Sequence, residues 1–388
     1  MTNNVALVLA YKELWRNRGR YLLISLVIAL ITLLVLFLAG LGEGLGNGNK
    51  EYLSKLNGEL VVYQDGADFT VAASQFGRSV MNDARRVPGV ADAGPIGIAQ
   101  AFVQRQNGEE PLSVSMIGVE PGRPGDVPVL DGRPLSSIRA NEAVIDRYTA
   151  LRTGYGVGDS LTIKSTQGSV DEFYTLDIVG VSDGRQYSIQ PSIIVPLVTW
   201  DSVRPKAIVG NSQSELVFNV IAARIAPGES EEAVAAAIGQ RLSGVVAVDR
   251  QTAYENAPGY SAQQSTIRTQ QAFTLLIGVL VVGGFFQIQT LQKVAQVGVL
   301  KALGASNSMV AIAASLQIIT TNVFGVLLGA LAAFGLAAVF PATVPIVFVG
   351  TQAAVAITTL LLIGPLGGLV SIRYLTRVEP LRALGLAQ

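Results

Sequence analysis

The side chains that could do chemistry in this sequence are carboxylates, tyrosines and methionines, because its 388 residues include no histidine and no cysteine. Histidine is the commonest catalytic base and the commonest metal ligand in proteins. Its absence excludes Ser-His-Asp catalysis, and the joint absence of histidine and cysteine excludes the usual zinc sites. We therefore expect no catalytic residue in this chain, and any external domain must be stable without disulfides.

The sequence also lacks the glycine pattern that binds ATP. A P-loop requires G-x-x-x-x-G-K-[ST], and no Gly-Lys dipeptide occurs anywhere in the chain. The glycines at 40, 42, 44, 46 and 48 do not have the G-x-G-x-x-G spacing either. On a helix, glycines four residues apart share a face and let a second helix approach closely, although a loosened helix end is the alternative. Any ATP hydrolysis that drives this protein must reside in a separate chain.

One short basic segment lies between two long uncharged stretches. It comprises residues 290–306, and its only charges are Lys293 and Lys301. The two uncharged stretches are residues 269–292 and residues 302–372, which border Lys293 and Lys301. Because both stretches are long enough to cross a bilayer, the basic segment must lie on one side of it, as a loop or a short helix.

Membrane-spanning helices are expected to position these residues. Half of the chain is hydrophobic and 14% is charged, and the mean hydropathy is +0.44, as is typical of a membrane protein. The last apolar run is too long for one span, and Pro341 and Pro345 near its middle divide it. A cleaved signal peptide is the alternative for the first helix, but its apolar core is longer than such peptides have. We expect four transmembrane helices, at residues 21–42, 269–292, 307–340 and 350–371.

Charge is distributed unevenly among the segments that flank these helices. The N-terminal stub (1–20), the middle segment (293–306) and the tail (372–388) together carry nine positive and two negative charges, whereas residues 43–268 carry 19 positive and 26 negative. The positive-inside rule therefore places both termini and the middle segment in the cytoplasm. We expect a multi-pass protein of the cytoplasmic membrane whose large region, 43–268, lies outside.

Residues 43–268 have the pattern of a mixed α/β domain. Short apolar runs bounded by turn residues predict strands, and two longer runs predict helices at residues 70–87 and 230–242. The expected fold class is thus an α-helical membrane protein with four transmembrane helices and a large extracytoplasmic α/β domain inserted between helices 1 and 2. The strands are expected at residues 59–63, 98–104, 113–119, 143–146, 160–164, 174–181, 192–196, 217–225 and 245–249.

Several motifs set in this architecture are similar to those of a known family. They are Gly298-Val-Leu-Lys-Ala-Leu-Gly-Ala-Ser306, Leu130-Asp-Gly-Arg-Pro134, Gly158-Asp-Ser-Leu161 and Val378-Glu-Pro-Leu-Arg-Ala-Leu384. Over nearly its whole length the sequence resembles the FtsX/MacB-like permease family of ABC transporters. The resemblance implies a non-catalytic permease that forms a homodimer and binds two copies of an ATPase subunit, which in turn bind the ATP.

Two further motifs look most like those of one branch of that family. Ala257-Pro-Gly-Tyr-Ser-Ala-Gln-Gln264 and Phe285-Phe-x-x-x-Thr-x-Gln-Lys293 are similar to motifs of the haem-efflux permeases, the HrtB-like branch. That resemblance implies haem as the transported substrate, with no cofactor in the chain itself. The partners it implies are the ATPase, a second copy of the permease and membrane lipid, and no nucleic acid.

The resemblance also implies that residues 293–306 couple the permease to its ATPase. On a helix, Val294, Val297 and Leu300 could fill a groove on the partner. The two lysines could pair with acidic groups of the ATPase, or merely follow the positive-inside rule. Many family members have Glu at the position of Gln296, so this chain lacks that charge. The expected coupling residues are Lys293, Gln296, Val297, Leu300, Lys301 and Gly304.

Haem as a substrate requires an apolar slot, an axial ligand and donors for two propionates. Without histidine and cysteine, the ligand must be a carboxylate, a tyrosine or a thioether. Arg268, Lys50 and Lys55 could meet the propionates, or could mark the lipid headgroup boundary. A Glu just outside a membrane helix is usually a solvated residue or a helix cap, which is the competing interpretation. The candidates are Glu51, Glu59, Glu43, Tyr63, Tyr260 and Met81, with the iron held by Glu59 or Glu51.

The mode of transport is also constrained by charge. No charged residue lies within the four expected spans, which argues against a polar conduit across the bilayer. We therefore expect haem to be extracted from the outer leaflet and released outward. Two alternatives remain open: a permease for a lipoprotein, peptide or drug, and a signal-transmitting permease that moves no substrate.

Overall fold

The computed structural model describes residues 11–105, 109–206, 216–340, 344, 346–348 and 350–376. Pro341, Pro345 and the motif at residues 378–384 lie outside the described residues. The chain forms two compact units. The helical unit comprises Met1–Gly44 and Ser265–Gln388, and the α/β unit comprises Leu45–Gln264.

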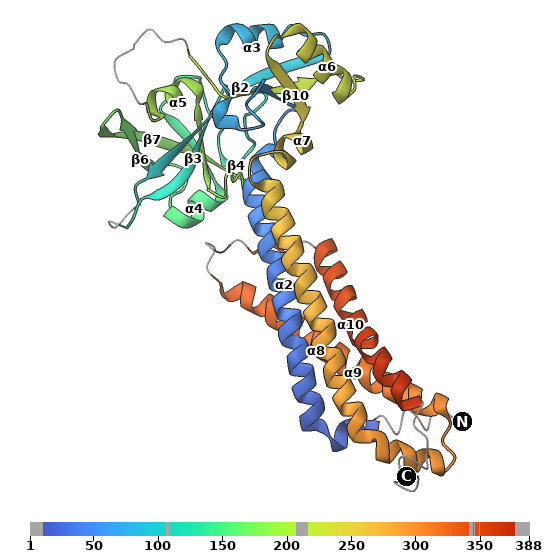
Figure 1. Cartoon of the computed structure of the whole chain (residues 1–388). Coiled ribbons are helices and arrows are strands. Elements are labelled where there is room, and N and C mark those ends of the chain that lie inside the picture. The colour runs from blue at the N-terminus through green and yellow to red at the C-terminus, as the bar shows by residue number, and fades with distance from the viewer. Residues whose placement is uncertain are drawn as a thin grey trace. The chain divides into compact units, whose positions relative to one another are not determined.

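The α/β unit is built on one mixed sheet (Figure 1). Its strand order is β10-β1-β9-β2-β3-β8-β5-β7-β4, and β6 pairs with both β2 and β7. Most neighbours are antiparallel, but β3 with β8 and β5 with β7 are parallel. The strands are β1 (Leu60–Gln64), β2 (Val90–Val103), β3 (Leu112–Val119), β4 (Val129–Gly132), β5 (Glu142–Asp146), β6 (Ser160–Gln167), β7 (Val170–Ser182), β8 (Ser192–Pro196), β9 (Val220–Ile225) and β10 (Val245–Asp249).

Both faces of this sheet are buried, as β1 illustrates. Leu60 and Val62 belong to one hydrophobic cluster, whereas Val61 and Tyr63 belong to a second. Successive side chains of a strand point to opposite faces, so a strand with apolar residues at every position is covered on both sides. Helices α3 (Arg78–Ala84), α5 (Leu197–Val203) and α6 (Glu231–Arg241) contribute to the first cluster, and the end of α2 and α7 (Arg250–Glu255) contribute to the second.

Trp200 of α5 packs where two glycines face each other across strands. Gly97 of β2 pairs with Gly118 of β3. A Cβ atom would lie 2.6 Å from the Trp200 ring at Gly97, and a Cβ at Gly118 would lie 2.4 Å from Trp200 Cγ. The indole therefore occupies the space that two side chains would fill, and only 2% of Trp200 is exposed. This tight fit makes Trp200 a reporter of the folded α/β unit.

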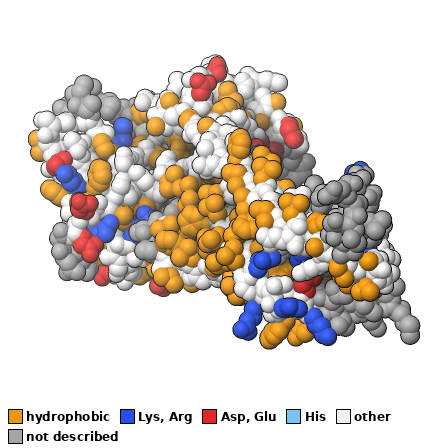
Figure 2. Space-filling model, turned by 60° about the horizontal axis from the view of Figure 1, so that its bottom comes forward, with side chains coloured by type: hydrophobic (Ala, Val, Ile, Leu, Met, Phe, Trp, Pro, Cys, Tyr) orange, Lys and Arg blue, Asp and Glu red, His pale blue; other side chains and the backbone are white. Residues whose placement is uncertain are grey.

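The helical unit contains the long apolar helices. Helices α2 (Arg18–Ser54), α8 (Tyr260–Ala302) and α9 (Asn307–Val339) are long and apolar enough to cross a membrane, and α10 (Gly350–Thr376) has a shorter apolar stretch at Ala353–Gly368. Gly325 and Gly329 of α9 pack against α2, because a Cβ on them would lie 2.7 Å from Ile28 and 2.4 Å from the Ala29 carbonyl oxygen. Figure 2 shows the broad band of hydrophobic side chains and the Lys and Arg side chains beside it.

The structure differs from the expected elements at a few places. Every expected strand is present, although β2 begins earlier than residue 98. Strand β4, which overlaps the motif at residues 130–134, was not expected. The expectation of one helix over residues 70–87 was wrong, because only η1 (Val71–Ala73) and α3 are helical there. Phe76, between them, exchanges two main-chain hydrogen bonds with Phe218 and is thereby drawn into an extended conformation. The short helices α4 (Arg147–Thr153), α5 and α7 were not expected.

Candidate functional site

The end of α8 forms the segment expected to couple the permease to its partner. The helix continues to Ala302, and Gly304, with φ of +95°, ends it. The Gly304 N–H donates to the Lys301 carbonyl and the Ala305 N–H donates to the Leu300 carbonyl, each at 3.0 Å. This is the Schellman arrangement, which requires a left-handed residue where glycine is favoured. The role of Gly304 visible in the structure is therefore to end the helix before α9 begins.

Both lysines of this segment contact groups of the same chain. Lys293 Nζ lies 2.6 Å from Glu13 Oε1 and donates to Tyr21 Oη and Gln317 Oε1, each at 2.8 Å. Lys301 Nζ donates at 2.9 Å to a carbonyl near the end of α10. Lys293 thus has an acidic partner within the chain, whereas the sequence left open both a pairing with the ATPase and a plain positive-inside role.

The apolar residues of the segment also differ in exposure from the expectation. Val297 is buried, with 7% exposed, and packs against α9, while Leu300 is half-buried beside a small cavity. The larger exposed side chains here are instead Gln296 and Val299 of α8 and Leu303, which follows its last residue and is 81% exposed. Their spacing of three and four residues places them on one helix face. Sequence reasoning missed Val299 and Leu303, although their spacing from Gln296 could have indicated them.

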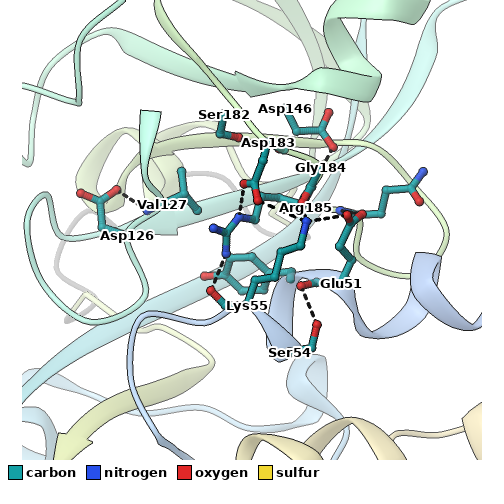
Figure 3. A network of polar contacts seen from close by, with 12 residues as sticks. Glu51, Ser54, Lys55, Asp126, Val127, Asp146, Ser182, Asp183, Gly184 and Arg185 are labelled. Atoms are coloured by element: carbon teal, nitrogen blue, oxygen red, sulfur yellow. Dashed lines mark hydrogen bonds and ion pairs between the residues drawn. The ribbon is translucent and has the colours of Figure 1, made fainter. Parts of the chain in front are cut away.

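A polar network surrounds the end of α2 in the α/β unit (Figure 3). Glu51 accepts hydrogen bonds from Lys55 Nζ at 2.8 Å and from the Gln186 N–H at 3.3 Å. Asp183 lies 3.2 Å from Lys55 Nζ and 2.7 Å from Arg185 Nε. Burial would lower the pKa of Lys55, but the hydrogen bonds and charges of Glu51 and Asp183 outweigh it and raise that pKa. Glu51 is thus held by Lys55 and by the loop between β7 and β8, which contains Asp183, Arg185 and Gln186, and 13% of its side chain is exposed.

The same loop is bonded to the main chain of α2. The Tyr52 N–H donates to the Gln186 carbonyl at 3.1 Å, and the Ile189 N–H donates to the Gly48 carbonyl at 2.9 Å. Gly48 and Tyr52 are four residues apart, so these are the two groups that an α-helix joins to each other. Ile189 has a φ of +63°, a strained value for a β-branched residue. The loop therefore competes for the hydrogen-bond donor and acceptor of one α2 turn, and this pairing is accompanied by backbone strain at Ile189.

An apolar cavity lies among α2, α8 and α10 in the helical unit. Its volume is about 450 Å³, and no charged residue lines it. Ligand pockets are commonly mostly apolar and of this size. Glu43 lies four residues beyond Ala39 and Arg268 three residues before Gln271, each on the helix face that lines the cavity. The lining residues are Val35, Ala39, Gln271, Leu275, Thr351, Val355, Ala356 and Thr359.

Comparison with known proteins identifies both parts of the chain. Residues 21–241 match the MacB-like periplasmic core domain, and residues 271–380 match the FtsX-like permease C-terminal domain. The chain belongs to the FtsX/MacB-like family of ABC transporter permeases. The resemblance inferred from the sequence is confirmed. In this family the permease is the non-catalytic subunit, and ATP hydrolysis belongs to a partner subunit.

Full-length relatives of this permease are known from two bacterial groups. The "Putative hemin transport system permease protein HrtB" of Staphylococcus haemolyticus is 26% identical over 385 residues, which cover 97% of this chain and 99% of that protein. The "Uncharacterized ABC transporter permease Rv2563" of Mycobacterium tuberculosis is 22% identical over 375 residues, covering 96% and 97%. The extracellular domain of the transporter YknZ from Gram-positive bacteria superposes with a TM-score of 0.36 at 13% identity, over 50% of this chain and 100% of that domain.

The residues expected to bind haem lie at separate places in the permease. Met81 belongs to the first hydrophobic cluster and Tyr63 to the second, so they lie on opposite faces of the sheet. Glu59 accepts a hydrogen bond from the Ile225 N–H at 3.0 Å, and Tyr260 packs edge-on against Tyr254. The described residues contain no group of three or more acidic side chains that could hold a metal ion. The structure therefore does not assemble these candidates into one site.

Proposed function

We propose that this permease extracts haem from the outer half of the cytoplasmic membrane and releases it outward. The observation that carries the proposal is the mostly apolar cavity of about 450 Å³ among the membrane-length helices α2 and α8 and the shorter apolar helix α10, which has no charged lining residue. A flat apolar substrate dissolved in lipid can enter such a cavity sideways without a polar conduit. The name of the Staphylococcus haemolyticus relative, a hemin transport permease, supports haem as that substrate.

The proposed arrangement in the membrane follows from the charges. Helices α2, α8, α9 and α10 are the four spans, both termini are cytoplasmic, and the α/β unit lies outside. Two permease chains associate, and each binds one ATPase subunit. ATP-driven closure of the ATPase pair moves the ends of α8, and this movement narrows the cavity so that haem leaves outward.

Glu43 becomes the first candidate for the iron ligand. It lies one turn beyond the cavity on the α2 face that lines it. Glu51, Glu59, Tyr63, Tyr260 and Met81 stay predictions with weaker support, because in the sequence none of them lies as near to a cavity-lining residue as Glu43 does. Arg268, exposed on the cavity-lining face of α8, is the preferred donor for a propionate.

Hemin titration of the purified permease tests this proposal. We expect a Soret shift with the wild type and a binding constant about tenfold weaker in Glu43→Gln, equivalent to about 1.4 kcal/mol. Glu232→Gln, an exposed residue of α6, is the matched control. Ala356→Trp should fill the cavity and abolish the shift, while Ala354→Trp, exposed on the same helix, should not. Absence of any shift with the wild type would refute haem as the substrate.

We also propose that Gln296, Val299 and Leu303 contact the ATPase. They form the exposed face at the end of α8, whereas Val297 is buried. Leu303→Asp should therefore abolish co-purification of the ATPase subunit. Val246→Asp, on an exposed site of β10, is the matched control. Undiminished binding of the ATPase by Leu303→Asp would show that docking occurs elsewhere.

A signal-transmitting permease is the second candidate function. The hydrogen bonds from the loop at residues 186–189 to Gly48 and Tyr52 favour it, because they hold, within the α/β unit, the end of a helix whose earlier residues belong to the helical unit. A permease of this kind would move no substrate and would act on a protein partner outside. It predicts a stable external partner in affinity purification and growth in hemin that is unchanged by deletion of the permease.

A further inference from the structure

Four polar side chains in the helical unit form a closed network. Glu13 comes from the segment before α2, Tyr21 from α2, Lys293 from α8 and Gln317 from α9. Lys293 Nζ contacts Glu13 Oε1 at 2.6 Å, and Gln317 Nε2 donates to Glu13 Oε2 at 2.7 Å. Tyr21 Oη donates to Gln317 Oε1 at 2.9 Å. The network therefore ties four segments of the chain together at one point.

Every polar group of the network is used. A lysine ammonium has three donors, and Lys293 directs them at Glu13, Tyr21 and Gln317. Both carboxylate oxygens of Glu13 accept a bond, and the pair has no net charge. Exposure is 5% for Tyr21 and 6% for Gln317, and the side chains of Lys293 and Glu13 are 14% and 20% exposed. A network this complete fixes the positions of its members far better than an exposed ion pair does.

The network lies on the same helix as the proposed docking face. Gln296 and Val299 lie three and six residues beyond Lys293 on α8, and Leu303 directly follows its last residue, Ala302, so one helix joins the network to this face. Holding Lys293 holds the rotation and axial position of this whole end of α8. A displacement of Leu303 must either carry Glu13, Tyr21 and Gln317 with it or leave a charge buried without its partner, which is strongly unfavourable.

We infer that the Glu13–Lys293 pair transmits movement of the ATPase from α8 to α2 and α9. The inference rests on the proposed docking of the ATPase at the end of α8. Lys293 is then a positioning residue that does not touch the ATPase itself. A lysine that merely marks the cytoplasmic boundary would have no need of Glu13. The pair, in contrast, makes Glu13 as important for coupling as Lys293.

The experiment separates docking from transmission. The permease and its ATPase subunit are co-purified, and permease-stimulated ATP hydrolysis is measured with MgATP. We expect Glu13→Gln and Lys293→Met to bind the ATPase within about twofold of the wild type and to lose stimulation about tenfold, within the range of coupling energies. Lys12→Met, exposed beside Glu13, is the matched control and should keep full stimulation.

A charge exchange provides the rescue. In Glu13→Lys combined with Lys293→Glu, the Gln317 amide can turn over so that its Nε2 faces the new carboxylate, and the Tyr21 hydroxyl can reverse its bond. We expect this double variant to recover at least a third of the stimulation. Tyr21→Phe, a milder change, should reduce it about threefold. Trp200 fluorescence and gel-filtration volume report whether each variant is folded.

Two results would overturn the inference. Normal stimulation by Glu13→Gln would show that the pair transmits nothing. Loss of ATPase binding in folded Glu13→Gln or Lys293→Met would show that the network serves docking instead. Failure of the docking proposal is a different observation, namely undiminished ATPase binding by Leu303→Asp.

Discussion

Asp146 gives a prediction whose size follows from the structure. Asp146 ends β5 and caps α4, where its carboxylate accepts a hydrogen bond from the Thr149 N–H at 2.7 Å. None of the residue is exposed, and Figure 3 shows it beside the loop that carries Arg185. Burial raises the pKa of Asp146 from 3.8 to about 6, although hydrogen bonds from Thr149, Ser192 and Arg185 oppose the rise. The folded protein therefore retains the Asp146 proton to a higher pH than the unfolded chain does.

The sign of the pH effect follows from proton linkage. Between the two pKa values the native state binds more protons than the unfolded state, so the free energy of unfolding falls as the pH rises. Each unit between the two pKa values corresponds to about 1.4 kcal/mol. The interval from 3.8 to about 6 therefore corresponds to about 3 kcal/mol in all, of which about 2.4 kcal/mol is lost between pH 4 and pH 7. Asp146→Asn does not titrate and should lack this loss.

The assay compares the two proteins at each pH. Urea unfolding of the full chain in detergent is followed by fluorescence of the buried Trp200, in a Trp15→Phe background because the sequence has two tryptophans. The free-energy difference between Asp146→Asn and wild type should change by about 2.4 kcal/mol from pH 4 to pH 7. Any constant cost of the asparagine amide facing N–H donors cancels from this change. A difference that stays constant within about 0.5 kcal/mol would refute the reasoning.

Asp249 provides the matched control for this experiment. It caps α7 as Asp146 caps α4, accepting a hydrogen bond from the Thr252 N–H at 2.9 Å. The hydrogen bond from the Thr252 side chain lowers the pKa of Asp249. Its stabilising contribution is therefore present above pH 4 and is lost as the pH falls through the lowered pKa. The free-energy difference between Asp249→Asn and wild type should therefore change little as the pH rises from 4 to 7.

The remaining predictions concern packing and strain. Gly329→Leu should reduce the yield of folded permease in membranes, because a Cβ would already lie 2.4 Å from the Ala29 carbonyl oxygen. Gly335→Leu is the control and should be tolerated, because there is open space around Gly335. Equal yields of the two variants would contradict this account of the α9–α2 contact. Ile189→Gly should raise the stability of the α/β unit by up to about 1 kcal/mol by relieving the positive φ, measured by Trp200 fluorescence; a clear destabilisation would show that Ile189 packing outweighs its strain.

Much of the fold could be predicted because its signals are local. Apolar runs broken by turns gave every strand except β4, and long uncharged runs gave the middle parts of the long helices α2 and α8, which extend beyond them at both ends. The helix over residues 70–87 was mispredicted because a long-range pairing between Phe76 and Phe218 overrides local helix preference. Helices α4 and α7 are each one or two turns long, and their signal is a single aspartate at a strand end, Asp146 or Asp249.

The candidate sites were harder to predict because they depend on contacts between distant residues. From the sequence, Lys293 could pair with a partner or mark the cytoplasmic side. Its ion pair with Glu13 joins residues 280 positions apart in the sequence, which no local pattern indicates. The contact of Glu51 was equally hard to predict, because its partner Gln186 comes from a loop far along the chain. Val299 and Leu303 were missed for the opposite reason. Which apolar residues of α8 face outward is decided by the packing of Val297 against α9, and sequence periodicity alone does not choose between the two faces.

Helix α2 connects the two kinds of contact on which function is proposed to depend. Tyr21 near its start belongs to the Glu13–Lys293 network, and Gly48 and Tyr52 near its end are bonded to the loop of the α/β unit. A continuous α-helix resists axial compression because each turn is hydrogen-bonded to the next. In the proposed mechanism, a movement of Tyr21 that follows ATPase closure passes along α2 and reaches the cavity-lining residues Val35 and Ala39 before it reaches Gly48. The proposed pump depends on this order, because the cavity must narrow before the movement reaches the end of α2 that belongs to the α/β unit.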